Sequence, residues 1–205
     1  MSKLNLIVML FLLFPSSSYA QKFSVKGNTL NYNTLIDGVS YDISWEDVDE
    51  FKSTLLKNPK ISKLNLTSEG GDLYASREMA NLVIDFELDT HVIEECSSAC
   101  VFVFLGGNKR TMQRGSKLGF HQTSWEASNI EAYYNETKED EGWESVFDFA
   151  SWIVDDTQKE VLIDFEYYLE RNVSGKFAIK TLQATSDDMW YPRRKELEDA
   201  GVIVE

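Results

Sequence analysis

The feature that most constrains the fold of this chain is a strand, turn and helix pattern that occurs twice in succession. Residues 61–67 alternate in polarity, residues 68–72 interrupt the alternation with two glycines, and a helical apolar period follows at Ala75, Met79, Leu82, Val83 and Phe86. Residues 90–93 form a second extended run, which a turn at residues 96–98 connects to the wholly apolar residues 99–105. A helix this apolar must be buried against a sheet. The pattern predicts an α/β domain with a parallel sheet and right-handed crossovers.

The segments on either side of this pattern are consistent with it. Residues 23–43 predict two or three short strands. Ser44 is typical of an N-cap, and the helix that it begins is expected to end near residue 57. Two more short strands are expected at residues 110–112 and 117–120. These segments add strands to the predicted sheet and one helix beside it.

The C-terminal part of the chain is rich in helix formers. Residues 125–144 are acidic and lack an apolar stripe, which favours a mobile loop or an exposed helix. Residues 146–169 predict two helices or one long bent helix, and their apolar faces indicate either core packing or a subunit interface. A helix is expected at residues 177–182. A short strand, a further helix and a final strand then complete the chain.

The composition indicates one packed domain and argues against an anionic partner. A chain of 205 residues with 43% hydrophobic and 13% aromatic side chains can bury a substantial core, and we expect a single domain at residues 21–205. The formal net charge of −14 opposes non-specific binding to phosphate backbones and to anionic lipid. Nucleic acid is therefore not an expected partner.

Residues 1–20 have the layout of a secretory signal peptide. Lys3 supplies a positive start, residues 4–14 are apolar apart from one asparagine, and small residues at Ser18 and Ala20 fit a signal-peptidase site. The apolar run is short for a bilayer, which needs about 20 residues. We predict cleavage after Ala20 and a periplasmic or secreted mature chain without a stable membrane anchor. The alternative is an uncleaved N-terminal anchor.

Cys96 and Cys100 are the only two cysteines of the chain. An oxidising compartment permits a disulfide between them, and a turn would bring them closer than a straight helix does. A local disulfide and two buried thiols are both open interpretations. Two thiols without a second pair or nearby histidines supply too few ligands for a metal, and we expect neither a metal nor another cofactor.

Ser98 and His121 are the candidate catalytic residues. A serine hydroxyl is a weak nucleophile unless a base takes its proton and donors stabilise the resulting oxyanion. Ser98 lies directly before the apolar helix, and His121 follows an extended run. The turn that contains Gly71 has the equivalent place one crossover earlier, and adjacent parallel strands bring such turns to the same edge of a sheet. Taken singly, Ser98 is also explained as a helix cap and His121 as a structural histidine.

Several short motifs resemble the ClpP/crotonase superfamily. Residues 68–71 (SEGG) resemble the S-P-G-G element of Clp protease subunits and of signal-peptide peptidase A. Residues 98–100 (SAC) and 119–122 (GFHQ) are similar to the nucleophile helix and the I-H-Q-P element of the Clp protease subunit. Together with the signal peptide, the C-x-S-A-C form of residues 96–100 looks most like periplasmic Clp-protease-like proteins.

The resemblance implies both a fold and a set of roles. The fold would be a ClpP/crotonase-like spiral of ββα units, with a mainly parallel sheet and helices packed around it. Ser98 would be the nucleophile and His121 the general base, while the backbone N–H groups of Gly71 and Ala99 would form the oxyanion hole. The implied function is an exported serine hydrolase, a peptidase that forms an acyl-enzyme with a peptide or protein substrate. Relatives of this fold also form homo-oligomers.

The chain departs from the family pattern at three places. Glu69 replaces the proline of S-P-G-G, Ser97 adjoins Ser98, and the position expected for the orienting acid is Ala184, with Asp187 as a nearby substitute. Loss of this acid costs about 10⁴ in rate in a well-studied serine protease. The alternative function is therefore a catalytically inactive binding or assembly module. Acyl-CoA chemistry, as in crotonases, does not suit an exported chain because that cofactor is intracellular.

Overall fold

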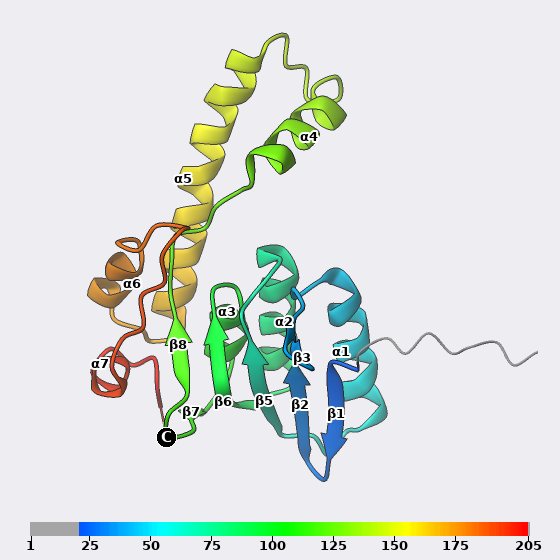
Figure 1. Ribbon diagram of the computed structural model, residues 1–205, viewed down its shortest axis with the longest axis vertical. Helices are drawn as coiled ribbons and strands as arrows, with labels where there is room; N and C mark the ends of the chain where they lie inside the picture. Colours follow the sequence, from blue (N-terminus) through cyan, green and yellow to red (C-terminus); the bar gives the residue numbers. More distant parts are fainter. Residues whose placement is uncertain (1–20, 205) are drawn as a thin grey trace, which may run out of the picture.

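The computed structural model describes residues 21–204, which contain a six-stranded, mainly parallel sheet (Figure 1). The strands lie in the order β1-β2-β5-β6-β7, and β7 and β8 pair with successive parts of β6. Only β1 and β2 run antiparallel in this sheet. The bounds are Phe23–Lys26 (β1), Thr29–Asn33 (β2), Lys63–Ser68 (β5), Asp89–Ser97 (β6), Arg110–Met112 (β7) and Lys117–Gly119 (β8). The predicted α/β fold with a mainly parallel sheet is confirmed, and the predicted signal peptide lies outside the described residues.

Four short strands begin the described chain, where two or three were expected. β1 and β2 form one antiparallel hairpin, and β3 (Leu35–Ile36) and β4 (Val39–Ser40) form a second, separate one. The turn of the second hairpin places Asp37 and Gly38 at φ values of 53° and 77°. Strands of two residues are too short to produce an alternating pattern, which explains why the sequence did not separate them.

Three helices, α1 (Trp45–Lys57), α2 (Leu73–Asp85) and α3 (Cys100–Leu105), lie side by side behind the sheet (Figure 1). Ser44 caps α1 as predicted, in a capping box with Asp47. The Asp47 carboxylate also accepts hydrogen bonds from the Tyr32 hydroxyl and the Lys22 ammonium group, both at 2.8 Å. Every side chain of α3 is buried, as its apolar sequence requires.

The C-terminal helices are α4 (Ala127–Thr137), α5 (Val146–Glu170), α6 (Gly175–Thr181) and α7 (Arg194–Asp199). α4 and α5 form a hairpin that projects away from the sheet (Figure 1). Of the alternatives predicted for residues 125–144, a mobile loop or an exposed helix, the structure has the exposed helix α4. Of those predicted for residues 146–169, two helices or one, it has the single helix α5. Aromatic contacts join the hairpin in place of an apolar stripe, between Tyr133, Tyr134, Trp143, Phe149 and Trp152. No helix within residues 21–204 has the length and apolarity needed to cross a membrane.

The two strands predicted near the C-terminus are reduced to single bridges. Trp190 pairs with Phe120 and Val204 pairs with Arg110, both antiparallel. These bridges attach the end of the chain to the edge of the sheet at β7 and β8. The Phe120 bridge matters for the site, because it holds the backbone directly before His121 in place.

Arg110 is a buried arginine that joins three helix ends. Arg110 is only 4% exposed. Its guanidinium donates to five backbone carbonyls, those of Leu105, Gly107, Arg171, Gly201 and Val202. These carbonyls lie at the C-terminal ends of α3, α5 and α7, where the helix dipole is negative. Burial, with the charge of Arg171 nearby, lowers the pKa of Arg110 to about 10. The guanidinium therefore remains charged at neutral pH and ties the C-terminal helices to the sheet.

We expect Arg110→Met to lower the free energy of unfolding by at least about 3 kcal/mol, because several buried carbonyls lose a charged donor. Urea denaturation followed by circular dichroism measures the change. Arg114→Met is the matched control, since Arg114 is exposed and its replacement should shift stability by less than about 0.5 kcal/mol. Equal effects of the two substitutions would contradict the role given to Arg110.

Candidate active site

Ser98 occupies the turn between β6 and α3 in a left-handed backbone conformation, with φ at 54°. This conformation costs a non-glycine residue on the order of 1–3 kcal/mol, and it is maintained only where the surroundings hold it. Here the Ser98 N–H donates to the Gly119 carbonyl at 2.9 Å, and the Ser98 carbonyl accepts from the Val101 N–H at 3.0 Å. The turn directs the strand into the helix and leaves Ser98 on the wall of a cavity.

His121 reaches Ser98 because β6 and β8 are parallel neighbours. Ser97 at the end of β6 pairs with Gly119 at the end of β8, so the turns after the two strands leave the sheet at the same edge. Nε2 of His121 lies 2.6 Å from Oγ of Ser98. This is hydrogen-bonding distance, the geometry that a nucleophile and its base require. The two residues singled out from the sequence are thus brought together.

The glycine turn packs directly against the serine turn. Gly70 and Gly71 both have positive φ values, 112° and 141°. A Cβ atom on Gly70 would lie 2.7 Å from the Cβ of Ser98 and 2.9 Å from the backbone oxygen of Ser97, and both separations are too short for a side chain. Gly71 forms a bridge with Ile43, whose backbone nitrogen would lie 2.2 Å from an added Cβ. Glycine is required at both positions for conformation and for space.

The N–H groups of Gly71 and Ala99 are available for an oxyanion. Both residues line the cavity together with Ser98 and His121. Within residues 21–204, neither N–H donates to a backbone acceptor, although the neighbouring Asp72 N–H donates to the Ile43 carbonyl. Backbone N–H groups without a backbone acceptor, on the wall of a cavity that also contains a serine hydroxyl, are groups of the kind that can stabilise a tetrahedral intermediate.

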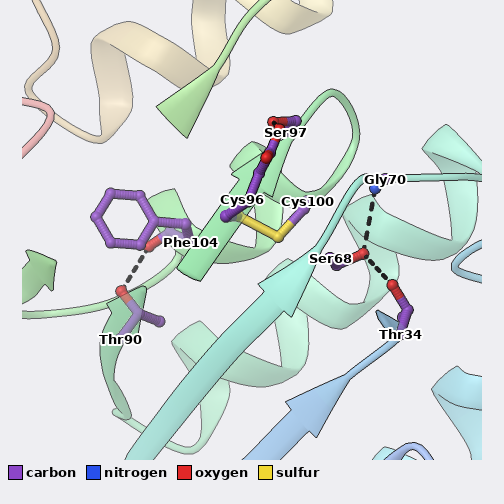
Figure 2. Close-up of a disulfide and its surroundings, with 9 residues drawn as sticks. Thr34, Ser68, Gly70, Thr90, Cys96, Ser97, Cys100 and Phe104 are labelled. Atoms are coloured by element: carbon purple, nitrogen blue, oxygen red, sulfur yellow. Dashed lines mark hydrogen bonds between the residues drawn. A yellow bond between two sulfur atoms is a disulfide. The ribbon is translucent and has the colours of Figure 1, made fainter. Parts of the chain in front are cut away.

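Ser68 supports the glycine turn from inside the sheet. Its hydroxyl oxygen accepts hydrogen bonds from the Thr34 hydroxyl at 3.0 Å and from the Gly70 N–H at 3.2 Å (Figure 2). Ser68 and Thr34 are both fully buried. Because these bonds hold Gly70 from behind, the position of the Gly71 N–H depends on residues that do not line the cavity.

Figure 2 shows the disulfide that joins Cys96 at the end of β6 to Cys100 at the start of α3. The sequence had left a disulfide and two thiols as alternatives, and the structure contains the disulfide. Both residues have no exposed surface. The bond spans the turn of residues 97–99 that carries Ser98.

The Ser97 hydroxyl binds a carboxylate and does not line the cavity, which distinguishes it from the hydroxyl of Ser98. Ser97 is 1% exposed, and its hydroxyl donates to the Glu95 carboxylate at 2.7 Å. The same carboxylate oxygen accepts from the Tyr191 hydroxyl at 2.6 Å, and Lys117 lies 3.7 Å from the other oxygen. Burial opposes ionisation of Glu95, but hydrogen bonds from Ser97 and Tyr191 and the charge of Lys117 outweigh it and hold its pKa below the usual range.

The second ring nitrogen of His121 has no hydrogen-bond partner within residues 21–204. Nδ1 is buried, and no described residue within 21–204 donates to it or accepts from it. Ala184 is buried beside this segment, with its carbonyl accepting from the Gln122 N–H at 2.9 Å. Asp187, the substitute considered from the sequence, is exposed and makes no hydrogen bond to His121. Ser98 and His121 therefore form a pair without a third member in this conformation.

The pair opens into a cavity of about 660 Å³ between the sheet edge and α5. Its apolar lining includes Phe102, Phe120, Val161, Phe165, Tyr168 and Leu182. Four acidic residues, Asp42, Asp72, Glu126 and Asp164, also line it. Glu69, the residue that departs from the family motif, is exposed and does not line the cavity. Its carboxylate is therefore not part of the cavity wall that contains Gly71 and Ala99.

Arg77 holds α5 in place as one wall of the cavity. From α2 it binds the carboxylates of Glu160 and Asp164 on α5, both at 2.5 Å, and its guanidinium lies 5.8 Å from the centre of the Phe102 ring. Burial raises the pKa of Asp164 even though Arg77 pairs with it. The wall is thus attached to the helix that follows the glycine turn.

No sequence pattern marks the residues that support the site from behind. Thr34 binds Ser68 across 34 residues of chain, and Tyr191 binds Glu95 across 96 residues. Neither pair has a characteristic spacing, so only the folded structure brings them together. Among residues 21–204, no group of three His, Cys, Asp or Glu side chains is arranged to hold a metal ion.

Gly70→Ala is expected to lower the free energy of unfolding by several kcal/mol, about 1–2 from the left-handed backbone and about 1–3 from overpacking against Ser98. Gly115→Ala is the matched control, because Gly115 has φ at 88° with nothing within 4 Å of an added Cβ, and it measures the backbone cost alone. Urea unfolding of both variants gives the difference. A cost for Gly70→Ala no larger than the control would contradict the close approach of the two turns.

No protein-family model and no curated protein matches the sequence. Among solved structures, a point mutant of ClpP1 from Listeria monocytogenes is similar to this chain, with a TM-score of 0.57 at 16% sequence identity. The match covers 86% of this chain and 89% of that chain. At this identity the likeness shows the fold alone. The chain therefore has a ClpP-like fold, as its motifs had led us to expect.

Proposed function

We propose that this protein is an exported serine hydrolase, a peptidase that acts through Ser98 and His121. The observation that carries the proposal is the 2.6 Å distance between Ser98 Oγ and His121 Nε2. Ser98 also lies in a left-handed turn on a cavity wall, next to two unengaged N–H groups. The ClpP-like fold supports the same reading by analogy.

The proposed reaction has two stages, acylation of Ser98 and hydrolysis of the acyl-enzyme. His121 Nε2 takes the Ser98 proton as Oγ bonds to the substrate carbonyl carbon, and the N–H groups of Gly71 and Ala99 stabilise the oxyanion. His121 then gives this proton to the leaving nitrogen as the C–N bond breaks, which leaves the acyl group on Ser98. A water molecule, deprotonated by His121, hydrolyses this ester and restores the serine.

We further propose that the chain acts in the periplasm or outside the cell. Residues 1–20 are the proposed signal peptide, and residues 21–205 the mature domain. A disulfide is expected in an oxidising compartment, which supports this location. Sequencing the N-terminus of the mature protein tests the cleavage after Ala20.

A homo-oligomer is proposed from the surface of α5. This helix exposes Phe147 by 80%, and its other exposed apolar side chains are Val146, Val154, Leu162, Ile163 and Leu169. An apolar surface of this kind on a projecting hairpin is typical of an interface between subunits. The acidic net charge again disfavours nucleic acid as a partner.

A specific observation favours the second candidate, a catalytically inactive binding or assembly module. No described carboxylate orients His121, and its Nδ1 atom is buried without a partner. When Nε2 acts as the base, the proton of the neutral ring is on Nδ1. A buried N–H donor without an acceptor at this position costs about 1–3 kcal/mol. This cost would slow hydrolysis, and at the upper end it favours a protein that keeps the fold without catalytic activity.

A fluorophosphonate probe should label the wild-type protein at Ser98, because the probe reacts with an activated serine hydroxyl. Ser98→Ala should abolish labelling, whereas Ser97→Ala should retain it since the Ser97 hydroxyl faces Glu95. Mass spectrometry of the labelled peptide identifies the residue. Folded wild-type protein that takes up no label would favour the inactive module.

His121→Ala is expected to lower the labelling rate by about 10²–10⁴, the usual contribution of a general base. His91→Ala is the control, because the His91 ring bonds to Thr111 and does not line the cavity. Burial lowers the pKa of His91, so its ring is neutral and its loss removes no charge at neutral pH. The rates are compared by labelling time courses with quenched samples, at equal concentrations of folded protein. Equal rates in the two variants would exclude His121 as the base.

A further inference from the structure

The Cys96–Cys100 disulfide encloses the proposed nucleophile. Figure 2 shows the disulfide between Cys96 and Cys100. The bonded residues stand on either side of Ser97, Ser98 and Ala99, and Ser98 in this turn has a left-handed backbone conformation. A conformation of this cost persists only if the residues on both sides of it are held. The structure supplies very different supports on the two sides.

On the strand side, Cys96 is fixed by the sheet. It pairs with Ser68 of β5 and with Leu118 of β8, so its backbone lies between two neighbours. Ser97 next to it is buried and donates to Glu95. This end of the turn cannot move without breaking the sheet.

On the helix side, Cys100 begins a helix whose start has no side-chain cap. α3 contains six residues, and its N-cap is Ala99, whose methyl group offers no hydrogen bond to the first turn. The helix is held by the burial of its side chains and by backbone hydrogen bonds from Val101 and Phe102 to the Ser98 and Ala99 carbonyls, at 3.0 and 3.1 Å. Residues with a side-chain oxygen normally hold a helix start at this position. The disulfide is the covalent link that attaches this start to the sheet.

We propose that the Cys96–Cys100 disulfide is a positioning element for Ser98, which makes the proposed hydrolase competent only once the chain is oxidised. The inference rests on the proposed function. The disulfide transmits the rigidity of Cys96 to Cys100, and so fixes both the Ser98 hydroxyl and the Ala99 N–H. The reduced chain keeps the fold but loses the alignment of these two groups with His121 and Gly71.

The short span of the bond gives it a local role. A disulfide stabilises a protein mainly by restricting the unfolded chain, and this contribution grows with the length of the closed loop. Only three residues lie between Cys96 and Cys100, so the contribution to global stability is at the low end of the range. Loss of the bond should therefore affect the reactivity of Ser98 more than the unfolding temperature.

Formation of the bond needs an oxidant. Two thiols lose two protons and two electrons, and a disulfide-bonded exchange partner is reduced to a dithiol in the same step. Because both cysteines are fully buried in the folded protein, exchange must occur before or during folding. An oxidising compartment would provide such a partner, and a chain that folds before export would remain without the bond.

The test compares oxidised wild-type protein with the double variant Cys96→Ala/Cys100→Ala. Fluorophosphonate labelling is followed over time at several probe concentrations, which separates the maximal rate kinact from the probe affinity KI, and the final labelled fraction is recorded. We expect kinact to fall at least tenfold, with KI and the labelled fraction unchanged. A merely structural role would instead lower the labelled fraction, because fewer molecules would be folded. Val48→Ala, a buried truncation in α1, is the control for lost stability and should retain the wild-type kinact.

A second measurement uses the natural chain. Wild-type protein is unfolded in urea with dithiothreitol, refolded in the same reductant and divided into two samples. The first sample is labelled in the reduced state. The second is unfolded again, refolded with oxidised glutathione so that the disulfide forms, and then labelled. Recovery of kinact on reoxidation supports the proposal.

Three outcomes overturn the proposal, and they differ in what else they decide. Equal kinact in the double variant and wild type overturns the positioning role and leaves the proposed function intact. Failure of both the double variant and the reduced chain to refold, seen by circular dichroism, shows a role in global folding instead. Absence of label on oxidised wild type overturns the proposed function, and this inference with it.

Discussion

The site depends on the contact between two backbone turns, at Gly70 and at Ser98. An added Cβ on Gly70 would lie 2.7 Å from the Cβ of Ser98, so only glycine fits at position 70. The contact exists because β5 and β6 are parallel neighbours that end at the same edge, where Ser68 pairs with Cys96. This arrangement lets a backbone donor from one turn and a hydroxyl from the other face one cavity.

The rest of the chain supports this edge from three directions. The Phe120–Trp190 bridge holds the backbone before His121, and Glu95 with Tyr191 holds Ser97 on the opposite side. Arg110 ties the ends of three helices to β7, so α5 stays close to the sheet while its other end projects into solvent (Figure 1). Residues remote in sequence thus converge on a short stretch of backbone.

Local patterns predicted much of the fold and part of the site. The alternation at residues 61–67 and the apolar run at residues 99–105 predicted β5 and α3, because side-chain periodicity follows directly from backbone geometry. The hairpin of α4 and α5 was predicted only as alternatives, because aromatic residues contact one another across it without a helical stripe. The family motifs identified Ser98 and His121 together. They did not decide whether Asp187 replaces the acid missing at Ala184, because that depends on where the Asp187 side chain lies, and the structure leaves it exposed without a bond to His121.

The sequence by itself determined the α/β class, the two turns after parallel strands and the candidate pair, because each is encoded by periodicity, turn residues or a short motif. Tertiary structure alone decided that the Ser97 hydroxyl binds Glu95, that Cys96 and Cys100 are bonded, and that no described carboxylate orients the histidine. The physical reason is distance. These outcomes depend on ångström-scale positions of side chains brought together by the packing of strands and helices, and no local spacing in the chain records them.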